Sequence, residues 1–227
     1  MHYDTDSVGL SVEVSDDTLR EGMQTPGLMF SIEEKLTIAQ APKEAGVRRM
    51  VVAHPPAHVS EVEATREIVR RVTDVKVFGL GRALRSDVDA IASTGANVSI
   101  HLPFEGGYER ALEACKYTKD RYPNLELSVG LVDVSSYSHE RLVRTAVEFE
   151  GAGADVIELP DTTGRLTPRR YGDLVRRVRE AVSCKLSVHC HDDRGLAVAN
   201  SLAGVEAGAE LVEAAVMGLG ERNGIAD

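Results

Sequence analysis

The sequence has few cysteines, few aromatic residues and no excess of positive charge, and each shortage removes a class of protein. Three cysteines (Cys115, Cys184 and Cys190) among 227 residues are too few and too scattered for a disulfide framework, which favours a reducing, cytoplasmic setting. Tryptophan is absent and aromatic residues make up 4%, so a stacking surface for single-stranded nucleic acid is not expected. The net charge of −10 argues against any nucleic acid partner, because phosphate binding requires a basic face.

Long hydrophobic runs are missing as well. No stretch reaches the roughly 18 apolar residues that cross a bilayer, and the N-terminal residues 1–10 are acidic and lack the apolar segment of a signal peptide. We therefore expect no membrane partner. The chain is 43% hydrophobic and 27% charged and contains no linker or low-complexity segment, so one globular domain over residues 1–227 is expected.

Short β-rich runs alternate with amphipathic helical runs along the whole chain. The expected strands are residues 11–15, 48–54, 75–80, 97–102, 125–132, 155–160, 185–191 and 211–218. Among the helical patterns between them, residues 31–46 open with Ser31 and have a glutamate three residues on, which predicts a capping box. A second pattern, residues 167–182, opens with Thr167 as the expected cap and Pro168 at the first helical position.

Eight strands that alternate with helices predict parallel β–α units, and eight is the number that closes a TIM (β/α)8 barrel. A doubly wound open sheet is the alternative, but no G-x-G-x-x-G fingerprint follows the first strand. We therefore predict an α/β fold of the TIM-barrel type. The pattern leaves the eighth helix missing between the last strand and Asp227. Either the sequence is cut short, or something else covers the outer face of strands eight and one.

The end of the seventh expected strand carries two histidines in the stretch SVHCHDDRG, residues 187–195. Residues two apart on a strand point to the same side, so His189 and His191 share a face and Cys190 faces the other way. Barrel enzymes carry their sites at the carboxyl ends of the strands, where two neutral imidazoles suit a divalent metal. Taken alone, the pattern is common, and the alternative is one solvated and one hydrogen-bonded histidine.

A carboxylate after the first strand can complete such a metal site. The segment DDTLREGMQ, residues 16–24, places Arg20 beside Glu21. Two histidines and one carboxylate would hold a metal and leave positions open for substrate or water. Arg20 would then stabilise a developing oxyanion. Taken alone, the segment is equally well interpreted as a surface loop with a salt bridge.

The segment DDTLREGMQ (16–24) is followed by PDTTG (160–164) and by the long run from HCHDD to GLGERNG (189–224). Together these three segments resemble the DRE-TIM metallolyase superfamily. The superfamily includes 2-isopropylmalate synthase, homocitrate synthase, citramalate synthase and 3-hydroxy-3-methylglutaryl-CoA lyase (HMG-CoA lyase). The resemblance spans roughly residues 10–225 and implies a TIM barrel. The R-E-G of residues 20–22 and the G-E-R-N-G-I that ends at Ile225 are most similar to homocitrate synthase.

The resemblance implies that Glu21, His189 and His191 hold a divalent metal, which would be Mg²⁺, Mn²⁺ or Zn²⁺. It implies that Arg20 acts in catalysis and binds substrate. The Ile225 position carries an asparagine near the metal in other branches of the superfamily, which is a departure from their pattern.

Further roles are implied for residues at the ends of other strands. Gln24 would act in catalysis by orienting substrate or metal-bound water, and Thr162 would bind the substrate carboxylate. Arg82 follows the third strand and is a candidate for binding a distal substrate carboxylate, with a simple surface cation as the alternative. Residues expected to brace the site are Asp16, Asn200 and Arg222. Glu221 could serve either purpose.

The resemblance leaves the general base unassigned. Many family members have Ser-x-Glu-Asp after the fifth strand, with a glutamate linked to proton transfer, whereas this chain has no glutamate in residues 129–133. The chain also lacks the C-terminal region that supplies a histidine and a tyrosine in the synthases, and the cysteine loop of the lyase. Removal of a proton from a thioester methyl group requires a positioned base. This chain offers His54, His101 and Asp133, and we predict catalytic roles for His101 and Asp133.

The predicted function is therefore an acyltransferase that condenses acetyl-CoA, as co-substrate, with a 2-oxo acid and then hydrolyses the thioester. By resemblance, the protein is expected to be a homodimer. A metal-dependent lyase or aldolase of the HMG-CoA lyase type is one alternative, because the metal and Arg20 serve both directions of the reaction. A non-catalytic barrel that binds a metal or a partner protein is the other.

Overall fold

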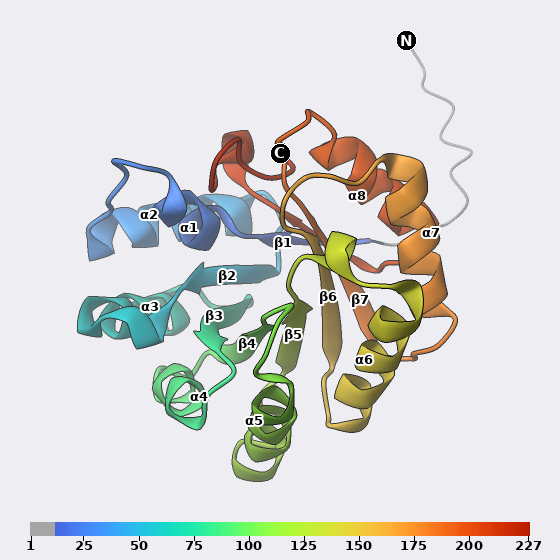
Figure 1. Ribbon diagram of the computed structural model, residues 1–227. Coiled ribbons are helices and arrows are strands. Elements are labelled where there is room, and N and C mark those ends of the chain that lie inside the picture. Colours follow the sequence, from blue (N-terminus) through green and yellow to red (C-terminus); the bar gives the residue numbers. More distant parts are fainter. Residues whose placement is uncertain (1–11) are drawn as a thin grey trace.

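The computed structural model describes residues 12–227, in which eight parallel strands form a closed barrel (Figure 1). The strands are β1 (Glu13–Asp16), β2 (Arg49–Ala53), β3 (Lys76–Arg82), β4 (Asn97–Leu102), β5 (Leu127–Leu131), β6 (Val156–Asp161), β7 (Lys185–Cys190) and β8 (Leu211–Ala214). Each strand pairs with the next, and β1 pairs with β8 to close the barrel. The predicted TIM barrel is confirmed, and the open sheet is excluded.

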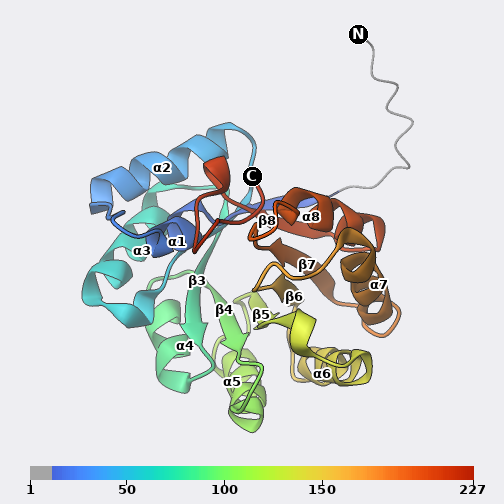
Figure 2. The same ribbon diagram turned by 45° about the horizontal axis from the view of Figure 1, so that its top comes forward.

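Helices surround the barrel, as the view in Figure 2 shows. They are α1 (Thr18–Glu21), α2 (Ile32–Glu44), α3 (Val59–Arg71), α4 (Arg85–Ala92), α5 (Tyr108–Arg121), α6 (His139–Gly151), α7 (Pro168–Arg179) and α8 (Ala197–Glu206). Short 3-10 turns are η1 (Gly22–Gln24), η2 (Pro55–Ala57), η3 (Val134–Ser136) and η4 (Val216–Gly218). In the described part of the chain, no α-helix follows β8, as the sequence pattern predicted.

The helix starts follow the capping signals in part. At α2, the Ser31 hydroxyl accepts from the backbone of Glu34, and the Glu34 carboxylate accepts from the Ser31 backbone at 2.7 Å, so the predicted capping box is confirmed. At α7, Pro168 occupies the first turn as predicted, and Thr167 is the residue before it. The prediction that Thr167 caps this helix is wrong for its side chain, which makes no capping hydrogen bond.

The strand bounds lie within two residues of the expected ones except at the last strand. Residue 11 of the first expected strand lies outside the described residues. The predicted strand 211–218 is wrong at its end, because β8 stops at Ala214 and Val216–Gly218 form a turn. The backbone N–H of Val216 donates to the Thr18 hydroxyl at 2.8 Å instead of to a neighbouring strand, which ends the ladder there.

The barrel interior is polar near its centre. Buried serines on β4, β5 and β7 project small hydroxyl groups inward, and they donate hydrogen bonds to two buried glutamates. Ser99 and Ser128 donate to Glu158, and Ser187 donates to Glu213 at 2.7 Å. Small side chains in this layer leave room for acidic groups beneath the mouth of the barrel.

Outside this polar interior, the outward faces of the strands pack against the helices in one hydrophobic cluster. Cys190 belongs to it and faces away from the two flanking histidines, as alternation predicted. The three cysteines are unpaired. Val14, on the outer face of β1 where the eighth helix would lie, is 43% exposed. Within residues 12–227, no helix combines the length and apolarity that crossing a bilayer requires.

Candidate active site

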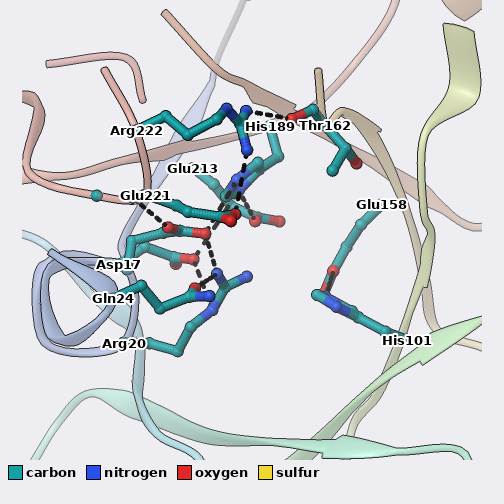
Figure 3. A network of polar contacts seen from close by, with 12 residues as sticks. Asp17, Arg20, Gln24, His101, Glu158, Thr162, His189, Glu213, Glu221 and Arg222 are labelled. Carbon is teal, nitrogen blue, oxygen red and sulfur yellow. Dashed lines mark hydrogen bonds and ion pairs between the residues drawn. The ribbon is translucent and has the colours of Figure 1, made fainter. Parts of the chain in front are cut away.

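A cavity of about 260 Å³ lies at the carboxyl ends of the strands (Figure 3). Polar side chains from both sides of the barrel meet in it. Its lining consists of Arg20, Glu21, Gln24, His54, Leu80, His101, Val132, Glu158, Pro160, Thr162, His189, His191, Glu213 and Glu221. This is the end of the barrel at which the sequence predicted the site.

The three predicted metal ligands meet on one wall of the cavity. Glu21 ends α1, which begins two residues after β1, whereas His189 lies on β7 and His191 directly follows that strand. One donor atom from each of the three residues lies within 4.8 Å of the others, and all three side chains are buried. The His189 Nε2 atom is 3.6 Å from the Glu21 Oε1 atom. Two donors that each lie about 2.0–2.2 Å from one ion are separated by a similar span.

The charge states of Glu21 and His191 fit a divalent cation. Burial alone would raise the pKa of Glu21, but Arg20 and the two histidines outweigh it and lower the pKa to about 2, so the carboxylate is anionic. Burial and the neighbouring His189 lower the pKa of His191 to about 4, which keeps its imidazole neutral. The buried His191 Nδ1 atom has no hydrogen-bond partner within residues 12–227. An anionic carboxylate and neutral imidazoles are the forms that ligate metals.

A second carboxylate contacts His189 on the ring nitrogen that faces away from Glu21. Glu213 lies opposite His189 in the register of β7 and β8, and its Oε2 atom is 2.8 Å from the His189 Nδ1 atom. A carboxylate on one ring nitrogen fixes the orientation of a ligating histidine and leaves the other nitrogen free for the metal. Here that free nitrogen is Nε2, on the Glu21 side. The sequence prediction missed Glu213, although the alternation of L-V-E-A places it on the inner face of β8.

Arg20 lies against this cluster. Its guanidinium group contacts the Glu21 carboxylate and donates to the Gln24 Oε1 atom at 3.2 Å, and the residue is 8% exposed. A fixed, buried cation beside a candidate metal site can stabilise negative charge that develops on a substrate oxygen. The structure therefore brings Arg20 and Gln24 together with the three candidate metal ligands.

Thr162 also lines the cavity, at the end of β6. Its hydroxyl oxygen accepts a hydrogen bond from the backbone N–H of Asp133 at 2.9 Å, which holds the side chain in place. Arg222 donates to the Thr162 carbonyl oxygen and forms two hydrogen bonds with Asp193. Arg222 thus ties the C-terminal loop to the ends of β6 and β7, the bracing role that the sequence suggested.

Two predicted site residues lie outside this lining. The Asp133 carboxylate accepts from Ser135 and Ser136 and pairs with Arg165 at 3.2 Å. The Arg82 side chain is 66% exposed and pairs with Asp87 at 2.8 Å, and it lines a neighbouring cavity of about 430 Å³. The structure therefore places neither side chain beside the candidate metal ligands.

Across the cavity from the metal ligands, His101 faces Glu158, as Figure 3 shows. Glu158 is buried on the inner face of β6 and was not predicted as a site residue. The signal was present in D-V-I-E-L-P-D, where alternation places this glutamate on the same face as Pro160. A buried acid in a short, otherwise apolar run is the feature that could have identified it.

The arrangement is that of a TIM barrel with a candidate metal site at the carboxyl ends of its strands. The sequence pattern of the HMGL-like family matches residues 11–227, and the chain belongs to that family. The predicted DRE-TIM relationship is confirmed.

Two relatives of the chain are named as synthases. The chain is 39% identical over 227 residues to a probable 2-isopropylmalate synthase of Methanopyrus kandleri, a match that covers 94% of this chain and 45% of that protein. It is 34% identical over 230 residues to a putative (R)-citramalate synthase of Archaeoglobus fulgidus, covering 95% and 47%. The chain thus spans about half the length of these relatives. The finer likeness to homocitrate synthase stays a prediction.

Solved structures agree on the fold. An HMG-CoA lyase of Bacillus subtilis superimposes with a TM-score of 0.81 at 19% identity, covering 93% of this chain and 78% of that one. An HMG-CoA lyase of Acinetobacter baumannii, solved with coenzyme A and 3-methylmalate, gives 0.80 at 20% identity and covers 97% and 78%. At this level of identity, the likeness shows a common fold.

Proposed function

We propose that this chain carries the metal-dependent condensation of acetyl-CoA with a 2-oxo acid, followed by hydrolysis of the thioester. The observation that carries the proposal is the buried set of Glu21, His189 and His191, with Arg20 beside it, at the mouth of the barrel. The names of the relatives support the same reaction class, since 2-isopropylmalate and citramalate synthases are enzymes of this kind.

Each cavity residue has a distinct task in this reaction. A divalent cation held by the three ligands would act as a Lewis acid on the ketone of the 2-oxo acid. Thr162 binds the substrate carboxylate through its hydroxyl group, and Gln24 orients the substrate. Arg20 stabilises the negative charge on the substrate oxygen by a charge-assisted hydrogen bond. His101, on the opposite wall, is the candidate base for the thioester methyl group.

Three finer features belong to the same proposal. The metal is Mg²⁺, Mn²⁺ or Zn²⁺, because a mixed carboxylate and imidazole set suits all three. The protein acts as a homodimer, which the resemblance to the synthases of this family supports. The protein works in the cytoplasm, which the three unpaired cysteines support.

Release of free CoA tests the proposal. Purified protein is mixed with acetyl-CoA and a pooled set of 2-oxo acids, with Mn²⁺ or with EDTA, and thiol groups are followed with a chromogenic reagent. We expect release that depends on both the metal and the 2-oxo acid, and that is lost in Glu21→Ala and in His189→Ala. The matched control is Glu126→Gln, which changes a carboxylate that pairs with Arg49 and Lys76 away from the cavity lining.

Absence of CoA release with every 2-oxo acid, although the protein is folded and binds Mn²⁺, contradicts the synthase proposal. Cleavage of a 3-hydroxy acid without CoA release would then favour the lyase direction, which the same residues can serve. A folded barrel that binds Mn²⁺ and converts neither kind of substrate would favour the non-catalytic alternative.

A further inference from the structure

The barrel contains a second acid–histidine pair, across the cavity from the candidate metal ligands. The His101 Nε2 atom on β4 faces the Glu158 Oε2 atom on β6 at 3.6 Å (Figure 3). We propose that Glu158 is a positioning residue, which holds His101 as the base that deprotonates the thioester methyl group. The inference rests on the proposed function, because the pair matters in this way only if a carbon acid reacts in the cavity.

Glu158 is itself held in one orientation. Its Oε1 atom accepts hydrogen bonds from the hydroxyl groups of Ser99 on β4, at 3.1 Å, and Ser128 on β5. Both serines are buried inside the barrel, and Glu158 is 4% exposed. Since both hydroxyl groups bind Oε1, the other oxygen, Oε2, remains directed at His101. Two donors on one oxygen and an imidazole beside the other are what a fixed orienting carboxylate requires.

The space for the pair depends on Gly130 of β5. A Cβ atom built on this glycine would lie 2.6 Å from the His101 Cδ2 atom and 2.9 Å from the Glu158 Oε2 atom. Real Cβ contacts are essentially never this short, so any larger residue would push the imidazole and the carboxylate away. The absence of a side chain at Gly130 lets the ring lie against the acid.

The charge of Glu158 also suits this task. Burial opposes its ionisation, but His101, Ser128 and Arg49 outweigh burial and lower the pKa of Glu158 to about 2, so the group is an anion at neutral pH. An anion beside the ring holds the imidazole with Nε2 on the carboxylate side. With Nε2 directed at Glu158, Nδ1 is the ring nitrogen of His101 that we assign as the base.

His101 lies between two cavities, as a base in a reaction between two substrates requires. The ring is 29% exposed, and it lines both the 260 Å³ cavity with the metal ligands and the neighbouring 430 Å³ cavity. A 2-oxo acid at the metal and a thioester entering from the neighbouring cavity would meet at this residue. His54 lines both cavities as well, but its buried Nε2 atom has no hydrogen-bond partner within residues 12–227.

The step itself moves one proton and one electron pair. The Nδ1 lone pair of His101 takes a proton from the thioester methyl carbon. The electrons of the broken C–H bond form the carbon–carbon double bond of the enolate, and the thioester oxygen takes the negative charge. The enolate carbon then attacks the ketone carbon, and the charge passes to the ketone oxygen beside Arg20. Glu158 remains an anion throughout and exchanges no proton.

The variant Glu158→Gln tests this assignment, because glutamine keeps the size and the acceptor oxygen and removes the charge. We expect kcat for CoA release to fall about 100-fold, the scale of a general-base contribution. The KM for the 2-oxo acid and the affinity for Mn²⁺ are expected to stay within about twofold. With trideuterated acetyl-CoA, the variant is expected to show a deuterium isotope effect on kcat, because impaired proton transfer then limits the rate.

Gly130→Ala serves as the second variant if Glu158→Gln does not fold, and the same slow, isotope-sensitive turnover is expected of it. Glu126→Gln is the matched control for loss of a barrel carboxylate. A Glu158→Gln enzyme with the parent kcat, or with a reduced kcat and no deuterium effect, overturns the inference and leaves the proposed function intact. If the parent protein itself releases no CoA, the proposed function fails and the inference fails with it.

Discussion

The Oε2 atom of Glu213 lies 2.8 Å from the Nδ1 atom of His189, and the two residues are aligned partners on adjacent strands. The other oxygen of Glu213 accepts from Ser187 at 2.7 Å, so the carboxylate is held at both ends. The contact leaves the Nε2 atom of His189 directed toward Glu21. The orientation of one candidate metal ligand is therefore set by a residue on a different strand.

Glu213→Gln is expected to weaken Mn²⁺ binding by about 10- to 100-fold, the usual effect of losing the partner of a ligating histidine. The amide can place its NH₂ group toward His189 and no longer enforces the required tautomer. Mn²⁺ affinity can be measured by electron paramagnetic resonance of the free ion during titration. Glu210→Gln, which removes the carboxylate paired with Arg179 next to the same strand, is the control. Equal affinities of both variants would show that Glu213 does not orient the ligand.

Arg20→Lys is expected to lower kcat at least about 100-fold while Mn²⁺ still binds. Lysine keeps the positive charge but has no planar fork, so it cannot contact Glu21 and Gln24 and also present a donor to the substrate oxygen. Steady-state CoA release at saturating Mn²⁺ gives kcat, and the metal titration is repeated on the same sample. A variant with nearly unchanged kcat would remove Arg20 from the chemistry and leave it a structural role.

Asp17→Asn is expected to stabilise the metal-free protein by about 1 kcal/mol. Asp17 is fully buried, and neither carboxylate oxygen has a hydrogen-bond partner within residues 12–227. Its carboxylate also lies in one cluster with Glu213. An amide removes the repulsion and can donate to Glu213. Urea unfolding in EDTA, followed by circular dichroism, gives the free energy, and a less stable variant would show that Arg20, 3.7 Å away, already compensates the charge.

The parts of the structure that the sequence predicted well depend on local periodicity. Alternation along 185–191 placed His189 and His191 on one face and Cys190 on the other, and the eight-fold repeat of strand and helix implied the closed barrel. These patterns are properties of neighbours in the chain. The candidate ligands Glu21, His189 and His191 could be combined because the resemblance to a known family supplied the long-range pairing.

The parts that the sequence did not reveal depend on which strands lie side by side or across the barrel. Glu213 matters because β8 aligns it with His189, and Glu158 matters because Gly130 makes room for His101. Neither the Glu213–His189 pair nor the Glu158–His101 pair can be predicted from a short stretch of sequence. Asp133 shows the opposite case, since its position after a strand suggested a base, but hydrogen bonds from two serines in the same loop occupy its carboxylate.

Ionised Glu158 is expected to contribute to the stability of the fold, and this contribution is expected to be lost in acid. The pKa of Glu158 is lowered from its ordinary value of 4.5 to about 2 in the folded protein, since contacts with His101, Ser128 and Arg49 outweigh burial. A group with a depressed folded-state pKa stabilises the fold above its unfolded pKa, and that contribution disappears as the pH falls through the folded value. The relevant window therefore runs from about pH 4.5 down to about pH 2.

Comparing the parent protein with Glu158→Gln separates the contribution of Glu158 to the free energy of unfolding from the contributions of the other carboxylates. The difference in free energy of unfolding between the two proteins is expected to be constant above about pH 5 and to shift against the parent as the pH falls toward 2, because only the parent loses the ionised group. Urea unfolding at four or five pH values, in EDTA and followed by circular dichroism, measures the difference. A difference that does not change with pH would mean that His101 and the serines do not favour the ionised form, and the positioning role of Glu158 would lose its electrostatic basis.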